Sequence, residues 1–287
     1  MFKSWRHPLS LSALVLLCFG GWSIAQPATA QVLVPYTLQL DFEALEEEGL
    51  ILAQEAAQLT QFQQYEAALP RAQLAAQLAP QDGQVWALLG SLYLQMDQTE
   101  EGIEALKQAR TLDRENASIL FALGSASFRI EDYQASVDYL KAGLVMEPET
   151  PSALFDLGNA YYLLTDYDAA IAAYDDAIDQ DESFWPAVNN IGLVFYENDR
   201  VDAAVQQWES ALEIAAEPQA EPQLAIAVAE YTHGNRRAGL LAGVAALALD
   251  PRYGEIEFLK ENLWGEQLLA DTTAFFADPL VEAALGN

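Results

Sequence analysis

The sequence has very few of the residues that build catalytic and metal centres. Its 287 residues include one cysteine and two histidines. A disulfide framework within the chain and the multi-cysteine or multi-histidine sets that hold zinc or iron–sulfur clusters are therefore excluded. The sequence also lacks a glycine-rich phosphate loop. We expect no cofactor, no metal site and no catalytic residues, and we predict that the protein is not an enzyme.

Basic residues are also scarce. Lys and Arg number 13 against 43 Asp and Glu, which gives a formal net charge of −30. Nucleic acid is excluded as a partner because its phosphates would be repelled, and adsorption to an anionic membrane surface is disfavoured for the same reason. Hydrophobic residues nevertheless make up 52% of the chain, far more than in a disordered acidic tail. The composition predicts a packed protein whose natural partner is basic.

The N-terminus has the pattern of an export signal. Lys3 and Arg6 precede an uncharged run at 9–25, and an Ala-Thr-Ala triplet follows at 28–30. A basic start, an apolar stretch and small residues at the end predict a signal peptide over 1–30 and export to the periplasm, thylakoid lumen or extracellular space. The alternative is an uncleaved anchor, because 17 apolar residues are at the lower limit for spanning a bilayer. In either case the membrane is contacted only through this segment.

The rest of the chain repeats itself with a fixed period. A large aliphatic residue followed by Gly recurs at intervals of 34 residues, at Leu89-Gly90, Leu123-Gly124, Leu157-Gly158 and Ile191-Gly192. Small residues recur in the same phase later in each unit, where paired helices would approach closely. The spacing predicts four units of two helices each. Their first residues are Gly83, Ala117, Pro151 and Trp185.

Two motifs identify the type of repeat. Trp86…Leu89-Gly90…Tyr93 is a near-complete first-helix signature, and Asp166-Tyr167…Ala170-Ile171…Tyr174…Ala177 matches the second helix. With these motifs the sequence resembles the tetratricopeptide repeat (TPR) family. The resemblance implies an all-α fold, a right-handed α-solenoid of tandem helix–turn–helix repeats with a C-terminal capping helix.

The predicted organisation extends the repeats in both directions. The unit at 219–253 has Gly243 in place of a bulky residue and is expected to pack less tightly. An amphipathic segment from Gly254 to Asp271 is predicted to be the helix that caps the array. Short acceptors in the turns are expected to cap each second helix: Asp97, Asp132, Asp166 and Asp199. In order, the segments are a signal peptide (1–30), an N-terminal linker (31–48), a degenerate TPR (49–82), four full TPRs (83–116, 117–150, 151–184 and 185–218), a degenerate TPR (219–253), and the capping helix with a tail (254–287).

The resemblance also implies where a partner would bind. In this family the first helices of successive units line a groove that holds peptides or partner helices. Aromatic rings there offer contact area, and Asn side chains can pair with a partner's backbone. The expected groove residues of this chain are Phe121, Ser125, Phe128, Phe155, Asn159, Tyr162, Asn189, Leu193 and Tyr196.

One TPR subfamily clamps the C-terminal carboxylate of chaperones with Lys, Asn and Arg. Asn159 and Asn190 resemble its Asn pair, but Phe155 stands where a Lys is needed. Glu221 and Ala225 stand where the last two cations are needed. Without those cations an anionic terminus has no counter-charge, so this ligand is excluded.

The sequence predicts a non-catalytic protein–protein interaction scaffold, an assembly factor for envelope or thylakoid complexes outside the cytoplasm. The alternative within the binding class is a TPR adaptor anchored by its N-terminal helix. An alternative from another class is a helical-toroid glycosidase that uses a carboxylate pair, although such folds do not produce an in-phase 34-residue repeat. His233, the histidine beyond the signal segment, precedes Gly234 and is interpreted as a turn residue.

Overall fold

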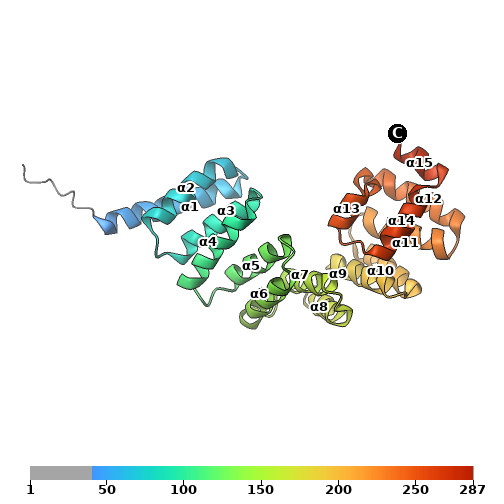
Figure 1. Cartoon of the computed structure of the whole chain (residues 1–287), viewed down its shortest axis with the longest axis horizontal. Helices are drawn as coiled ribbons and strands as arrows, with labels where there is room; N and C mark the ends of the chain where they lie inside the picture. The colour runs from blue at the N-terminus through green and yellow to red at the C-terminus, as the bar shows by residue number, and fades with distance from the viewer. Residues whose placement is uncertain (1–40, 287) are drawn as a thin grey trace, which may run out of the picture. The chain divides into compact units, whose positions relative to one another are not determined.

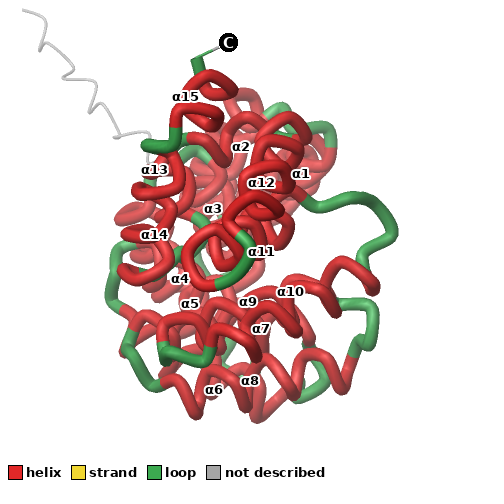
Figure 2. Tube along the Cα trace, turned by 90° about the vertical axis from the view of Figure 1, so that its right-hand side faces the viewer, coloured by secondary structure: helices red, strands yellow, loops and turns green. Residues whose placement is uncertain are grey.

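The computed structural model describes residues 41–286, and over that range every regular element is a helix (Figures 1 and 2). The predicted signal peptide lies outside these residues. The helices form six consecutive pairs followed by a C-terminal group. The pairs are α1 (Phe42–Gln61) with α2 (Tyr65–Leu78), α3 (Gly83–Gln95) with α4 (Thr99–Leu112), α5 (Ala117–Arg129) with α6 (Tyr133–Met146), α7 (Pro151–Leu163) with α8 (Tyr167–Gln180), α9 (Trp185–Glu197) with α10 (Val201–Ile214), and α11 (Ala220–His233) with α12 (Arg236–Leu249). The C-terminal group is η1 (Pro251–Gly254), α13 (Ile256–Glu261), α14 (Glu266–Phe276) and α15 (Pro279–Leu285).

The pairs follow the predicted repeat. The helices α3, α5, α7 and α9 begin at the four predicted first residues. Each first helix packs along the second helix of its own pair, and each second helix packs against the first helix of the next. First helices of successive pairs also contact each other: α5 contacts α7, and α7 contacts α9. The predicted all-α solenoid is therefore confirmed.

The recurring glycines allow the two helices of a pair to approach each other. A Cβ at Gly158 would lie 2.4 Å from the Tyr174 ring, and one at Gly192 would lie 2.4 Å from the indole of Trp208. Both rings are fully buried. A larger residue would push the helices apart and open the densest part of the core.

The turns inside the pairs share a backbone feature that the sequence did not reveal. The chain adopts a positive φ at a residue that recurs every 34 positions and is never glycine: Gln63, Asp97, Glu131, Thr165 and Asp199. Asp132 and Asp166 cap their second helices by accepting from the backbone N–H groups of Ala135 and Ala169, as predicted. The prediction was wrong for Asp97 and Asp199. These two residues occupy the left-handed position itself, one residue before the N-caps Gln98 and Arg200.

The N-terminal pair begins earlier than expected. Helix α1 starts at Phe42, and Asp41 caps it by accepting from the Ala44 N–H at 3.2 Å. Residues 42–48, which we expected in the linker, are thus helical. The acidic residues of this stretch hid the helix because they interrupt its apolar pattern.

The C-terminal cap is a group of short helices, whereas a single helix was predicted. The chain breaks between α13 and α14 at Leu263, which has a φ of 63°. Helix α14 then turns back and packs against α9 and α11. Gly243 does not loosen the last pair as expected, because the buried ring of Phe275 fills the space: a Cβ at Gly243 would lie 2.2 Å from its Cζ.

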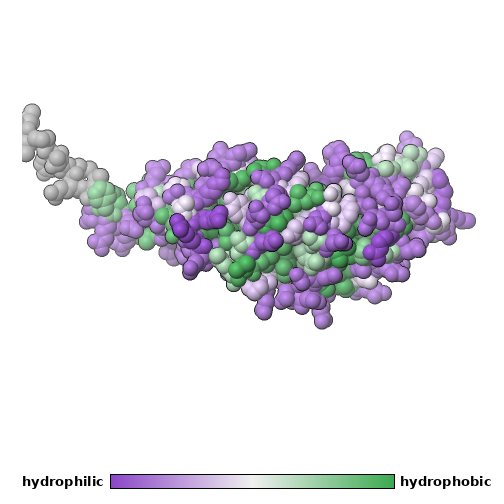
Figure 3. Space-filling view, turned by 60° about the horizontal axis from the view of Figure 1, so that its bottom comes forward, coloured by the Kyte–Doolittle hydropathy of each residue, from purple (hydrophilic) through white to green (hydrophobic). Residues whose placement is uncertain are grey.

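Two further properties bear on location and binding. Within residues 41–286, the helices are too short or too polar to cross a bilayer. Hydrophilic residues cover most of the face seen in Figure 3, with hydrophobic residues between them along its middle.

Candidate functional site

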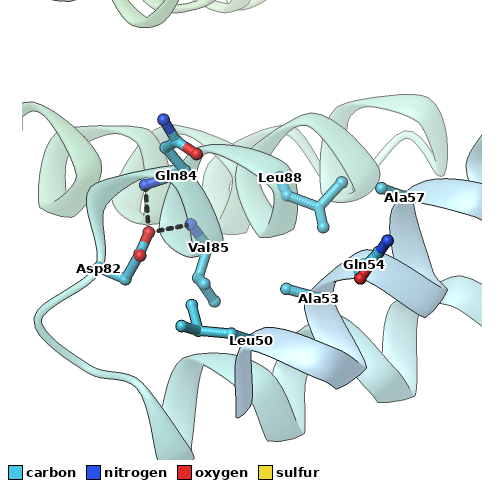
Figure 4. Close-up of a pocket in the computed structure, with 8 residues that line it drawn as sticks. All are labelled: Leu50, Ala53, Gln54, Ala57, Asp82, Gln84, Val85 and Leu88. Atoms are coloured by element: carbon cyan, nitrogen blue, oxygen red, sulfur yellow. Dashed lines mark hydrogen bonds between the residues drawn. The ribbon is translucent and has the colours of Figure 1, made fainter. Parts of the chain in front are cut away.

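Residues of neighbouring first helices line three cavities. The cavity nearest the N-terminus, about 330 Å³, lies between α1 and α3 (Figure 4). Leu50, Ala53 and Ala57 of α1 face Val85 and Leu88 of α3 across it. The Asp82 carboxylate caps α3 by accepting from the Gln84 and Val85 N–H groups at 2.8 and 3.0 Å. This cavity can receive an apolar side chain.

The second cavity, about 250 Å³, lies between α5 and α7. Ser125, Phe128, Arg129, Asp156 and Asn159 line it. Asp156 accepts a hydrogen bond from the Ser125 hydroxyl at 3.0 Å. Burial raises the pKa of Asp156, and the hydrogen bond from Ser125 opposes that shift only in part. The guanidinium of Arg129 is engaged in hydrogen bonds within the chain: it donates to the Leu94 carbonyl at 2.7 Å and to Asp97 at 2.6 Å.

The third cavity, also about 250 Å³, adjoins the second and shares Asn159 with it. We call it the Asn–Glu pocket. Helices α7, α9, α11 and α13 contribute to it, and no Lys or Arg belongs to its lining. The lining residues are Phe155, Asn159, Trp185, Pro186, Asn189, Asn190, Glu221, Glu261, Asn262 and Leu263.

Three asparagines of this pocket form a connected chain of amides. Asn159 Oδ1 accepts from the Tyr174 hydroxyl at 2.8 Å and from Asn190 Nδ2 at 2.9 Å. Asn189 Nδ2 donates to Asn190 Oδ1 at 3.1 Å and to Glu221 Oε1 at 3.2 Å. Asn189 Oδ1 is buried and has no hydrogen-bond partner among the described residues. A buried acceptor without a donor costs free energy, so a ligand that donates there would be favoured.

Glu221 lines the pocket and is only 9% exposed. Besides the bond from Asn189, its carboxylate accepts from Trp264 Nε1 at 3.3 Å and from the Tyr253 hydroxyl at 3.3 Å. All three donors are neutral. Burial raises the pKa of Glu221 to about 7, although the bonds from Asn189, Trp264 and Tyr253 act in the opposite direction. The pocket therefore holds a carboxyl group whose charge is sensitive to its surroundings near neutral pH.

The structure divides the nine expected groove residues into two groups. Phe121, Ser125, Phe128, Phe155 and Asn159 are partly exposed, and all but Phe121 line the second cavity or the Asn–Glu pocket. The Phe121 ring packs over Gly143, where a Cβ would lie 2.4 Å from the ring, so it serves helix packing. The other four are buried: Tyr162, Asn189, Leu193 and Tyr196. Of these, Asn189 still lines the Asn–Glu pocket, whereas the other three line none of the three cavities.

Burial at the end of α9 comes from the chain's own C-terminus. The Tyr196 hydroxyl donates to Asp271 of α14 at 2.6 Å. The neighbouring Glu197 accepts from the first-turn N–H groups of α14, at Gln267 and Leu268, both at 3.0 Å. Helix α14 thus covers the part of the face where Tyr196 and Leu193 were expected to meet a partner. Local periodicity could not reveal this, because the covering helix is some 70 residues away.

Seven of the ten residues that line the Asn–Glu pocket were not among the expected groove residues, and three of them bear on its chemistry. Trp185 appeared only as the first residue of a repeat, and Glu261 only as a polar residue of the cap. Glu221 appeared only as the residue at a position where chaperone-binding TPR proteins need a cation. The signal that could have singled it out is an acidic residue at a first-helix position that should be buried.

Two other features bear on a chemical role. His233 ends α11, half exposed, with Nε2 3.5 Å from Asp271 Oδ2. Within residues 41–286, no group of three or more His, Cys, Asp or Glu side chains could hold a metal ion.

Tandem helix pairs whose first helices line cavities on one face define a solenoid of helical hairpins. A comparison with protein families shows which repeat it is. Residues 87–153, 121–183 and 155–221 each match the family model described as tetratricopeptide repeat. The chain therefore carries tetratricopeptide repeats across 87–221. Among curated proteins, none matches the sequence.

Solved structures support the same fold. A MamA protein is 27% identical, with a TM-score of 0.55 over 58% of this chain and 92% of that chain. YrrB, described as a TPR protein with an unusual peptide-binding site, is 19% identical, with a TM-score of 0.54 over 62% of this chain and 94% of its own. Pseudomonas aeruginosa pilF is 15% identical, with a TM-score of 0.61 over 77% and 99%.

Proposed function

We propose that the protein is a non-catalytic interaction scaffold that captures an extended segment of a partner protein on its first-helix face, between α5 and α11. The observation that carries this proposal is that two cavities adjoin at Asn159. Successive side chains of one extended segment can enter neighbouring cavities, while the shared amide of Asn159 pairs with the segment's backbone.

The residues around these cavities suit such a ligand. Phe128, Phe155 and Trp185 are partly exposed rings from three successive first helices. Aromatic anchors of this kind contribute much of the binding free energy at protein interfaces. The fold is shared with YrrB, for which a peptide-binding site is described. The apolar cavity between α1 and α3 offers a further contact for a longer partner.

Photo-crosslinking in the native compartment tests the site. Phe128 is replaced by benzoylphenylalanine in one variant, and Val145, which lies on the second helix α6 and is 84% exposed, is replaced in a control. We expect a discrete crosslinked partner from position 128 and none from 145. Equal crosslinking from both positions, or crosslinking from 145 alone, would move the binding surface to the second helices and overturn the proposal.

The proposal for the biological setting rests on the N-terminal sequence. A cleaved signal over 1–30 would deliver a scaffold for envelope or thylakoid assemblies, and a retained segment would make the protein a membrane-anchored adaptor. Sequencing the N-terminus of the mature protein separates the two: a chain that begins at Gln31 is the exported scaffold. The glycosidase alternative gains no support from residues 41–286, where Glu221 is buried and bonded to three neutral donors.

A further inference from the structure

The Asn–Glu pocket has the size of a single side chain. Its volume of about 250 Å³ lies below the range of about 300–1,000 Å³ that is usual for small-molecule and cofactor sites. Phe155, Trp185 and Pro186 form apolar parts of the wall, and polar side chains come from α7, α9, α11 and the end of α13. A long side chain with an apolar stem and a polar end matches this division.

Two buried oxygens of the pocket have unused acceptor capacity. Asn189 Oδ1 has no donor. Glu221 Oε2 accepts a single bond, from the Tyr253 hydroxyl at 3.3 Å, whereas a carboxylate oxygen has two acceptor sites. Glu261, an exposed residue, adds a second carboxylate to the lining. The group that satisfies such a site is a donor with several N–H bonds and no acceptor, which describes an ammonium or guanidinium group.

The charges of the pocket and of the whole chain also favour a cationic ligand. The lining includes two carboxylates and neither Lys nor Arg, and the whole chain carries a net charge of −30. A field of this sign attracts cations and repels anions during encounter. A cation close to Glu221 would also compensate for the cost of burying an ionised carboxylate among neutral groups.

We propose that the Asn–Glu pocket receives a lysine or arginine side chain from a basic, extended segment of the partner protein, with Glu221 and Asn189 binding its charged end. The inference rests on the proposed function, whose site it specifies. Trp185 and Phe155 flank the aliphatic stem, and Asn159 lies where the pocket meets the neighbouring cavity.

Binding should depend on pH in one direction. The pKa of Glu221 is raised to about 7, and only the ionised carboxylate attracts a cation. Tyr253 of η1 donates to Glu221, Glu261 of α13 is the other titratable residue in the pocket lining, and α9 presents the neutral Asn189 and Asn190. Since the ionised fraction falls about tenfold from pH 8 to pH 6 for a pKa near 7, affinity is expected to fall by about the same factor.

The test uses defined probes and the full chain. N-Acetyl-lysine N-methylamide is titrated at pH 8 while the side-chain amide signals of Asn159 and Asn190 and the indole signal of Trp185 are followed by NMR. The matched uncharged probe is N-acetyl-norleucine N-methylamide, and free n-butylammonium represents a small amine without a peptide backbone. We expect saturable shifts with the lysine probe, at least tenfold weaker shifts with norleucine, and weaker binding of butylammonium.

A pair of variants tests the assignment of the counter-charge. Glu221→Gln should weaken the lysine probe at least tenfold, and its binding should lose the pH dependence. Glu209→Gln removes one exposed charge on α10, outside the pocket, and should leave affinity within twofold. If Glu221→Gln does not fold, the comparison of lysine with norleucine on the unmodified chain decides alone.

The outcomes separate the two proposals. Equal shifts with norleucine, or an unchanged affinity in folded Glu221→Gln, would overturn the basic-side-chain inference, and butylammonium binding as tightly as the lysine probe would overturn a protein segment as its source. Crosslinking of a partner from position 128 together with silent lysine probes would leave the scaffold function in place and reject only this inference. Lysine binding without crosslinking from 128 would support the pocket chemistry and reject engagement of the cavity between α5 and α7.

Discussion

The Tyr196 hydroxyl donates a hydrogen bond to Asp271 Oδ2 at 2.6 Å, and this bond joins two helices whose residues are 75 positions apart. Tyr196 is fully buried, and the acceptor is a carboxylate that also faces His233 Nε2 at 3.5 Å. The end of the repeat array and the C-terminal group are therefore one packed structure.

Removing this bond should destabilise the C-terminal group. Tyr196→Phe keeps the ring and deletes the donor to a carboxylate, which costs about 1–3 kcal/mol. Urea unfolding of the variant measures the loss. Tyr161→Phe is the matched control, because no hydrogen bond of the Tyr161 hydroxyl occurs within residues 41–286, and it should change the free energy of unfolding by less than about 0.5 kcal/mol. Equal losses in both variants would mean that the Tyr196–Asp271 bond contributes nothing of its own.

Gly265 is needed because the Glu197 side chain approaches it closely. A Cβ there would lie 2.2 Å from Glu197 Cδ, and Glu197 caps α14 through the Gln267 and Leu268 N–H groups. Gly265→Ala should displace the carboxylate and loosen α14. Hydrogen exchange should then show loss of protection over 266–285 with the protection of 83–180 unchanged. At Gly286 an added Cβ would lie 3.4 Å from the Glu282 carbonyl oxygen, so Gly286→Ala is the tolerated control.

Phe275 completes the core of the last helix pair. Its ring is fully buried, fills the space beside Gly243 and meets the Tyr231 ring edge-on at 5.2 Å. Phe275→Ala should cost about 3–5 kcal/mol, the usual range for emptying a buried aromatic site. Leu280→Ala removes a residue that is 62% exposed and should cost under about 1 kcal/mol. Thermal unfolding compares the two, and similar shifts in Tm would contradict the packing role of Phe275.

Burial of Glu221 should make stability depend on pH. Its pKa is about 7 in the folded chain against an ordinary 4.5, so the folded state holds a proton that the unfolded state has lost. The stabilisation is full below pH 4.5 and is lost as pH rises towards 7. Glu221→Gln has no such proton. Relative to the variant, the unmodified chain should therefore lose up to about 3 kcal/mol between pH 4.5 and 8, and a pH-independent difference would show that Glu221 titrates normally.

Thr165 occupies the left-handed turn position with a φ of 59°. A β-branched residue is poorly suited to that region, whereas Asn tolerates it well. Thr165→Asn should raise the free energy of unfolding by roughly 0.5–1 kcal/mol. Thr111→Asn, at an exposed helical position, should give no gain. Chemical denaturation measures both, and a loss in Thr165→Asn would contradict the assigned strain.

The repeat itself could be predicted because its determinants are local. Gly158 and Gly192 recur with the aromatic residues that contact them, and both members of each contact lie inside one 34-residue unit. The helix starts at Gly83 and Trp185 follow from the same phase. What escaped prediction depends on distant segments: the break at Leu263, the ring of Phe275 beside Gly243, and the burial of Tyr196 under α14.

The candidate site was predictable in part for the same reason. Asn159, Phe128 and Phe155 belong to first helices, and the repeat phase alone places them on one face. The pocket itself needs α11 and α13 as well, since Glu221 and Glu261 come from segments outside the regular repeats. In the sequence, Glu221 stands out only because it occupies a position where a cation is needed. The structure shows that it is buried and bonded to Asn189, whose Oδ1 has no hydrogen-bond partner among the described residues.

The contacts of α14 with both α9 and α11 determine how the array can change in length. A duplicated 34-residue unit inserted between α8 and α9 would carry α9 to α15 along as a block and keep the bond from Tyr196 to Asp271. The same unit inserted between α10 and α11 would separate the two surfaces that α14 bridges. Growth of the protein by repeat duplication is therefore permitted on one side of Trp185 and opposed on the other.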